Sequence, residues 1–279
     1  MDAIADFLST PWALACAVGL GGIWGSFFNV VIARVPRGES IVRPPSRCMS
    51  CQAPVRAWDN IPVLSYLLLR GRCRRCGAHI SVRYPLVEIL TAAIAAGIYW
   101  KFVGADASGP VAIRLGRFAV YFTFASVLIV LGFIDLDTKR LPDAITLPGI
   151  VILFFATFAA HDAPWTERLI GVAAGYLFVR LIADFYYYVL KREGMGLGDG
   201  KLLALMGAVL GWKSLPVVVF VASVVGTAVS IPILLATRDR AAAKSLRHVE
   251  VPFGPFLAVG ALVYLFVGDQ ILALVIPAG

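Results

Sequence analysis

The sequence is dominated by apolar runs that are long enough to cross a lipid bilayer as helices. A membrane-spanning helix needs about twenty mostly apolar residues, and about eight runs of this kind follow one another along the chain. They lie at roughly 12–34, 85–103, 114–134, 144–160, 168–190, 202–213, 214–236 and 253–276. The sixth run is short, and Trp212 and Lys213 separate it from the seventh. The pattern predicts an all-α polytopic membrane protein with about eight transmembrane helices.

The composition fits a chain whose solvent is lipid. Hydrophobic residues make up 59% of the sequence and charged residues only 15%, whereas an ordinary soluble domain is about half apolar and about a quarter charged. The first apolar run has neither a basic start nor a small-residue cleavage site. We therefore interpret it as a retained helix and not as a signal peptide.

The basic residues predict how the chain is oriented. Most of the 25 Lys and Arg fall in alternate loops of the eight-helix scheme, with the richest loop between residues 34 and 83. Because cytoplasmic loops carry the excess of Lys and Arg, these loops are expected in the cytoplasm and both termini in the periplasm. The net charge of +8 is thus explained by membrane topology, and no nucleic-acid partner is expected.

Two Cys-x-x-Cys pairs lie in the first cytoplasmic loop, a small loop domain over about residues 36–84. The four residues are Cys48, Cys51, Cys73 and Cys76. This spacing is typical of a tetrahedral zinc site, and a shell closed by four thiolates is structural. A reducing compartment disfavours disulfides. Four reduced thiols without metal, or redox-active pairs, remain the alternatives.

Two acidic segments are predicted to meet at the cytoplasmic face of the membrane. One contains Asp135 and Asp137, after the third run. The other contains Gly196, Gly198, Asp199 and Lys201. Either acid of the first segment could meet Asp199, and two carboxylates that share one water and one proton form an aspartyl-protease site. The glycines would let an extended substrate approach closely. Ordinary interfacial acids beside a glycine-rich turn are the alternative.

These motifs resemble those of the bacterial prepilin leader peptidases, bifunctional enzymes that also N-methylate the cleaved pilin. The resemblance extends over nearly the whole chain and is strongest at residues 25–34, 59–62, 80–88, 134–143 and 196–201.

The resemblance implies that Asp135 and Asp199 are the catalytic pair, with Asp137 as the fallback. Asp137 is only two residues from Asp135 and would point elsewhere on a continuing helix. The implied substrates are type IV prepilins and pseudopilins, cut between a basic leader and an apolar helix at the cytoplasmic face of the bacterial inner membrane. The implied methyl donor is S-adenosylmethionine. The expected domains are a first transmembrane helix (1–35), a cysteine loop for zinc and methyl transfer (36–84), and a peptidase core (85–279).

Glu88 is the sole acid of the second apolar run. It is interpreted either as a cofactor- or amine-binding residue of methyl transfer or as an acid that favours the positive end of a helix. Two other functions compete with the main one. They are a peptidase without methyltransferase activity and, in another class, a proton-coupled transporter, which would hold its acids near the bilayer midplane.

Overall fold

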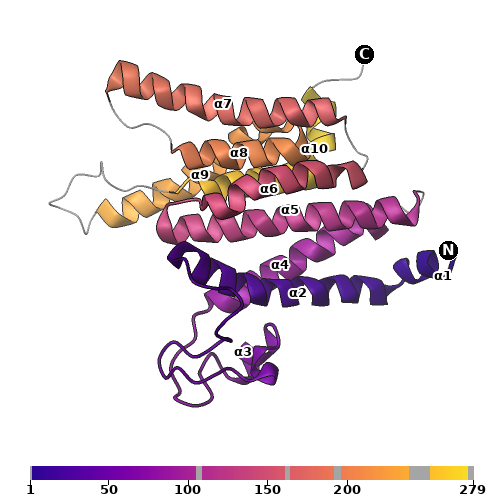
Figure 1. Cartoon of the computed structure of the whole chain (residues 1–279), viewed down its shortest axis with the longest axis vertical. Helices are drawn as coiled ribbons and strands as arrows, with labels where there is room; N and C mark the ends of the chain where they lie inside the picture. The colour runs from indigo at the N-terminus through magenta and orange to yellow at the C-terminus, as the bar shows by residue number, and fades with distance from the viewer. Residues whose placement is uncertain (1, 105–108, 161–163, 192–195, 239–251, 276–279) are drawn as a thin grey trace. The chain divides into compact units, whose positions relative to one another are not determined.

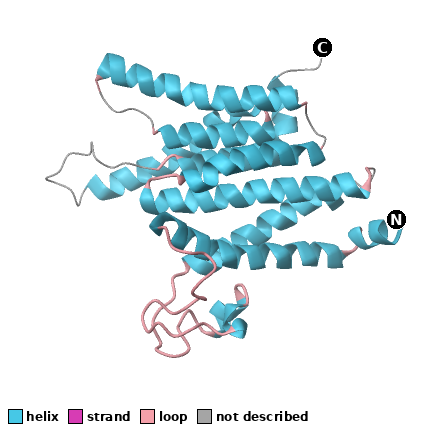
Figure 2. Ribbon diagram, in the orientation of Figure 1, coloured by secondary structure: helices cyan, strands magenta, loops and turns pink. Residues whose placement is uncertain are grey.

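The computed structural model describes residues 2–104, 109–160, 164–191, 196–238 and 252–275. Ten α-helices account for most of these residues, and among them no strand is present apart from two isolated bridges (Figures 1 and 2). The predicted all-α fold class is confirmed. Residues 239–251, in the predicted loop between the seventh and eighth apolar runs, lie outside the described part of the chain.

The chain divides into two compact units, Met1–Val130 and Leu131–Gly279. The first contains α1 (Asp2–Leu8), α2 (Pro11–Arg34), α3 (Leu64–Leu68), α4 (Arg83–Tyr99) and most of α5 (Val111–Thr138). The second contains the end of α5 and then α6 (Asp143–Ala156), α7 (Trp165–Leu190), α8 (Leu197–Leu210), α9 (Ser214–Arg238) and α10 (Gly254–Val275). Short 3-10 or π turns lie at Val35–Arg37, Ala57–Asn60, Trp100–Gly104 and Thr157–Ala159.

A helix lies at each of the eight predicted apolar runs, namely α2 and α4 to α10. Five helical segments of the described chain are long and apolar enough to cross a membrane: Pro11–Arg37, Arg83–Gly104, Val111–Thr138, Trp165–Val189 and Ser214–Pro232. Asp143–Ala159 and Gly254–Gly268 are shorter apolar helices. The protein is therefore polytopic, and the total of eight crossings stays a prediction.

In the first unit, α2 and α4 pack so closely that glycine is required between them. A Cβ atom on Gly21 would lie 2.7 Å from the Cα of Ala92, and one on Gly25 would lie 2.7 Å from the Cα of Glu88. Glycines four residues apart allow two membrane helices to approach in this way. Buried Asn29 of α2 donates a 3.1 Å hydrogen bond to the Tyr84 carbonyl of α4.

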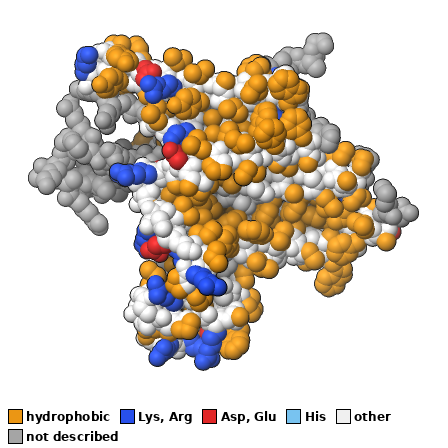
Figure 3. Space-filling view, viewed as in Figure 1, with side chains coloured by type: hydrophobic (Ala, Val, Ile, Leu, Met, Phe, Trp, Pro, Cys, Tyr) orange, Lys and Arg blue, Asp and Glu red, His pale blue; other side chains and the backbone are white. Residues whose placement is uncertain are grey.

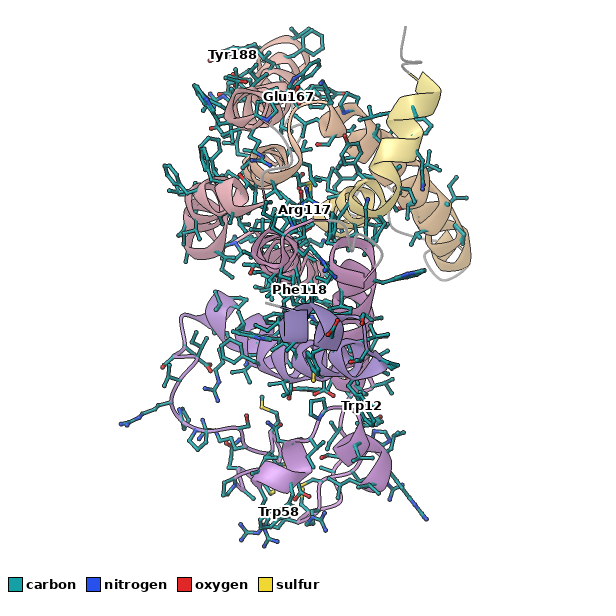
Figure 4. The ribbon with its side chains drawn as sticks, turned by 90° about the vertical axis from the view of Figure 1, so that its right-hand side faces the viewer. Trp12, Trp58, Arg117, Phe118, Glu167 and Tyr188 are labelled. Atoms are coloured by element: carbon teal, nitrogen blue, oxygen red, sulfur yellow. The ribbon has the colours of Figure 1, made fainter. Side chains whose placement is uncertain are left out.

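In the second unit, α8 is the central helix. Its residues from Leu202 to Val209 are all buried, and it packs mainly on α7 and α6. Gly211 has a left-handed backbone with φ of 77° and ends α8, which confirms the predicted break before the seventh run. Beside this break, Lys213 forms a 2.8 Å ion pair with Glu167 of α7. Figure 4 labels the Glu167 side chain.

Candidate functional site

Asp135 lies in the last turn of α5 and is buried, with 5% of its surface exposed. Its Oδ2 atom accepts a 3.0 Å hydrogen bond from the backbone N–H of Gly254, at the start of α10. Asp137, two residues further on, is exposed. Residues two apart on a helix point in different directions, so only Asp135 of these two faces the packed helices.

Asp199 lies in the first turn of α8 and is half-buried. It interacts electrostatically with Asp135, so the second unit brings together the two acids that the sequence placed far apart. Because Asp135 is in the last turn of α5, this pair stands at a helix end. A transporter with acids at the middle of the bilayer would need a different position.

The glycine run shapes the approach to Asp199. Gly196 directly precedes α8, and its carbonyl accepts the Asp199 backbone N–H at 3.1 Å. A Cβ atom on Gly198 would lie 3.4 Å from the side chain of Leu141. A methyl group at 198 would therefore be in van der Waals contact with the segment between α5 and α6.

Lys201 has a specific partner that sequence reasoning did not identify. Its Nζ atom forms a 2.5 Å ion pair with Asp143, the first residue of α6. The lysine side chain is 25% exposed and the aspartate side chain 57%. The pair joins the start of α8, two residues after Asp199, to the start of α6.

The four cysteines of the first unit form one cluster. Their sulfur atoms all lie within 4.8 Å of one another, and Cys48 Sγ is 3.8 Å from Cys76 Sγ. Four thiolates at about 2.3 Å from a tetrahedral zinc ion would stand about 3.8 Å apart, so the cluster matches the size of a four-thiolate metal site. The structure thus shows a group of four residues that could hold a metal ion.

The two Cys-x-x-Cys pairs have the same backbone construction. The N–H of Cys48 donates to the Ala53 carbonyl, and the N–H of Cys73 donates to the equivalent Ala78 carbonyl, at 2.9 and 2.8 Å. The residue after each pair has a left-handed backbone, with φ of 56° at Gln52 and 71° at Gly77. Two turns of one design deliver two sulfurs each, which is the usual way in which a chain encloses a structural metal.

Backbone N–H donors surround one sulfur atom of the cluster. The N–H groups of Cys51 and Ser50 face the Cys48 sulfur and lower the pKa of that thiol to about 6. A metal ligand must be the thiolate, so donors that stabilise the negative charge favour coordination.

An ion pair fixes the second cysteine turn. Arg74, between Cys73 and Cys76, donates to both carboxylate oxygens of Asp59 over 2.7 to 3.0 Å. The Arg74 guanidinium lowers the pKa of the Asp59 carboxyl by hydrogen bonding and by charge. Asp59 of the 59–62 segment thus contacts the second Cys-x-x-Cys turn directly.

Glu88 is buried, with 8% of its surface exposed, and it binds the cysteine loop from α4. Its Oε2 atom accepts the Val63 N–H at 2.7 Å, and the Ser26 side chain of α2 also hydrogen-bonds to it. The Val63 backbone lies at φ 59° and ψ −49°, a conformation that β-branched residues rarely adopt. No signal in the sequence indicated this bond, because Val63 lies in a loop.

Glu88 also lines a cavity of about 840 Å³ in the first unit. Ser26 and Asn29 of α2 form one wall, and the cysteine loop forms the other with residues that include Asp59, Ser65 and Arg74. This volume is within the range of small-molecule sites, roughly 300–1,000 Å³. The cavity joins the predicted cofactor residue to the cysteine loop.

The helices, the paired aspartates and the four-cysteine cluster define a multi-pass membrane protein with an acid pair typical of aspartyl peptidases. Two family models match the chain: the bacterial peptidase A24 N-terminal domain at residues 20–102 and the type IV leader peptidase family at residues 122–231. The chain belongs to the type IV leader peptidase family.

Curated relatives match over nearly their whole length and are named prepilin leader peptidase/N-methyltransferase. The protein from Burkholderia pseudomallei is 39% identical over 94% of this chain and 87% of its own length. Those from Neisseria gonorrhoeae and Pseudomonas aeruginosa are 35% and 33% identical and cover 94% and 96% of this chain. The alignments include 93% and 96% of these two relatives. No solved structure matches the chain.

Proposed function

We propose that this protein cleaves the basic leader from type IV prepilins and pseudopilins and then N-methylates the new N-terminal residue. The observation that carries the peptidase proposal is the interaction between Asp135 and Asp199, two acids from separate helices of one unit. The printed names of the relatives support both activities.

In the peptidase step, one carboxylate of the pair acts as the general base on a water molecule. The other is kept protonated by its neighbour and donates a hydrogen bond to the scissile carbonyl. The Gly254 N–H orients Asp135, and the Lys201–Asp143 ion pair orients the start of α8 that carries Asp199. Gly196 and Gly198 leave room for an extended substrate beside these acids.

The methyl-donor site is assigned to the cavity under the cysteine loop. When bound there, S-adenosylmethionine supplies an electrophilic methyl group. Buried Glu88 would attract a positive charge, either that of the donor or that of the pilin amine, while Ser26 and Asn29 offer further polar contacts. Residues 36–84 and the first turns of α4 thus form the methyltransferase part, and the peptidase core follows within residues 85–279.

We assign zinc to the four-cysteine cluster. Four thiolates leave no open position, so the ion would be structural and would hold the two cysteine turns together without entering the chemistry. A loop of this size has little core of its own, so binding of the metal is expected to contribute directly to its folding.

The proposed location is the bacterial inner membrane, with the termini in the periplasm and the acid pair at the cytoplasmic face. This orientation fits the substrate. A basic leader stays in the cytoplasm while the apolar pilin helix stays in the bilayer, so the scissile bond reaches the ends of the helices that carry Asp135 and Asp199.

One assay tests both activities. Purified full-length protein in lipid is mixed with a prepilin, with and without S-adenosylmethionine, and the product masses are measured. We expect leader loss in both samples and a further gain of one methyl group only with the donor. Leader loss without a mass gain would support the peptidase-only alternative, and an uncut prepilin would overturn the proposal.

A further inference from the structure

Part of the cysteine loop packs against the middle of α2. A loop confined to the cytoplasm would instead lie past Arg34, the basic end of this helix. A Cβ atom on Gly22 would lie 3.3 Å from Pro62 Cβ, so the loop touches α2 at this glycine. Gly22 is 11 residues from Pro11 and 12 from Arg34, which places it about 17 Å from either end of α2 at 1.5 Å per residue. Half the thickness of the bilayer core is about 15 Å, so Pro62 lies at membrane depth.

A second contact, with α4, also lies inside the end of a helix but less deeply, because Glu88 is about 7.5 Å from Arg83 at 1.5 Å per residue. The neighbouring residue Val63 donates its N–H to Glu88, which lies five residues inside α4 from Arg83. Both α2 and α4 belong to segments long and apolar enough to span the membrane, and Arg34 and Arg83 mark their basic ends. Two independent contacts therefore hold this part of the loop beside the apolar lengths of the helices.

The helix that follows Pro62 is α3, and it presents one strongly apolar face. Leu64, Leu67 and Leu68 are 49%, 64% and 73% exposed, and their spacing places them on one side of the helix. Ser65 points the other way and is buried. Figure 3 shows hydrophobic and basic side chains both at the surface of the region that contains the cysteine loop. Three adjacent leucines exposed to water would be unfavourable, whereas lipid would accept them.

Several backbone N–H groups of this segment bond to protein partners, as is needed where a bilayer excludes water. Ile61 N–H donates to Ser65 Oγ at 2.9 Å, and this hydroxyl donates to the Trp58 carbonyl at 2.9 Å. Further N–H donors and their partners are Val63 to Glu88, Leu64 to Pro62, Leu67 to Val63 and Leu69 to Ser65. Two side chains, those of Glu88 and Ser65, provide bonds that water would supply in an ordinary loop.

We propose that residues 61–68 form a re-entrant segment that dips into the bilayer beside α2 and inserts the Leu64, Leu67 and Leu68 face among lipid acyl chains. Lipid is the occupant because Pro62, just before this face, contacts α2 at Gly22, and the neighbouring Ile23 is 63% exposed on the same apolar helix. The inference concerns only the depth of the segment and does not depend on either proposed enzyme activity.

The depth of Leu67 can be measured directly in the full-length protein. A trifluoromethyl-phenylalanine probe replaces Leu67, and its fluorine relaxation is measured in lipid nanodiscs with dissolved oxygen, which concentrates in the bilayer, or with a water-soluble gadolinium chelate. The same probe at Ile23 is the lipid reference. The probe at Arg75, an exposed basic residue of the second cysteine turn, is the water reference.

We expect the oxygen-to-chelate ratio at 67 to match that at 23 within about two-fold and to exceed that at 75 by about ten-fold or more, because the two quenchers partition oppositely between lipid and water. The same probe at Leu68, in protein that retains its metal content, is a control for local perturbation caused by the label at 67. Strong chelate access at both positions would overturn the proposal. So would protection from both quenchers, since that result would mean that protein covers the leucines.

Discussion

The backbone N–H of Gly254 donates a 3.0 Å hydrogen bond to Oδ2 of Asp135 and joins the start of α10 to the end of α5. The contact leaves no room for a side chain, because a Cβ atom on Gly254 would lie 2.6 Å from the same oxygen. Backbone donation holds a carboxylate at a fixed position more firmly than a mobile side chain could.

Replacing this glycine should therefore impair cleavage through the position of Asp135. For Gly254→Ala we expect kcat for leader removal to fall by about 10- to 100-fold, because small displacements of a reacting group carry penalties of that size. The KM for prepilin should change little, since the substitution alters Asp135 and not a pocket for the substrate. Steady-state kinetics on a fluorogenic prepilin peptide would measure both constants.

Two other glycines give matched controls for that variant. A Cβ atom on Gly132, one turn before Asp135 on α5, meets Pro255 at an ordinary 3.7 Å, so Gly132→Ala should keep near-normal kcat. A Cβ atom on Gly260 of α10 would lie 2.5 Å from the Val218 carbonyl oxygen. Gly260→Ala should thus lower stability while the folded fraction stays active. Equal kcat losses for Gly254→Ala and Gly260→Ala, per folded molecule, would refute the positioning role.

The two paired aspartates should both be essential for cleavage. Asp135→Asn and Asp199→Asn should each reduce cleavage by at least about 10³-fold, since an amide cannot act as the base on water. Asp137→Asn should retain most activity, because Asp137 is exposed in the structure. Membrane insertion and thermal stability of each variant should be compared with the parent protein. Near-normal cleavage by either of the first two variants would contradict the assignment of Asp135 and Asp199 as the catalytic pair.

The four cysteines should hold one zinc ion per chain. Metal analysis of purified protein should give about one equivalent, the stoichiometry of a four-thiolate site. Changing Cys73 and Cys76 together to Ser should abolish the metal and expose the cysteine loop to protease before it affects leader cleavage by the second unit. Protein with four free thiols in this loop and no zinc would contradict the prediction.

The Asp59–Arg74 ion pair should slow the loss of that metal. Asp59→Asn removes the negative charge that pairs with Arg74. We expect zinc transfer to a chelator to become roughly two- to five-fold faster, which corresponds to the free energy of an exposed ion pair. Because Arg74 lowers the pKa of Asp59, the pair is fully formed above the ordinary carboxyl pKa and is lost only as pH falls through the lowered value. The rate ratio should therefore stay constant between pH 6 and 8, and a ratio that vanishes at pH 6 would exclude this explanation.

Two substitutions of Glu88 can distinguish the effect of its negative charge from the effect of its hydrogen bond to Val63. Glu88→Gln keeps an oxygen that can accept the Val63 N–H, so the cysteine loop should stay in place while the negative charge is lost. We expect methylation to fall by about ten-fold or more, the effect of removing one buried charged contact, while leader cleavage continues. Glu88→Ala removes the acceptor as well and should also loosen the loop. Full methylation by Glu88→Gln would leave Glu88 with a structural role only.

The sequence by itself determined the helix positions and the four-cysteine cluster. Apolar runs predict helices because a helix forms all its backbone hydrogen bonds within itself, as lipid requires. The Cys-x-x-Cys turns are local structures, and their spacing predicts how the sulfur atoms are placed. The residues alone left either Asp135 or Asp137 as the partner of Asp199, and the family resemblance favoured Asp135; the catalytic role of the pair stays a prediction. Burial of one and exposure of the other distinguish the two side chains.

Only the tertiary structure decided which distant groups support those residues. The partners of Asp135, Lys201 and Glu88 are Gly254, Asp143 and Val63, and none of them is a neighbour in the sequence. Two of these bonds use a backbone N–H, which every residue except proline carries and which no side-chain pattern can reveal. The depth of residues 61–68 is likewise set by contact with α2 and α4. Hydropathy records how apolar a segment is, whereas its depth depends on the helices against which it packs.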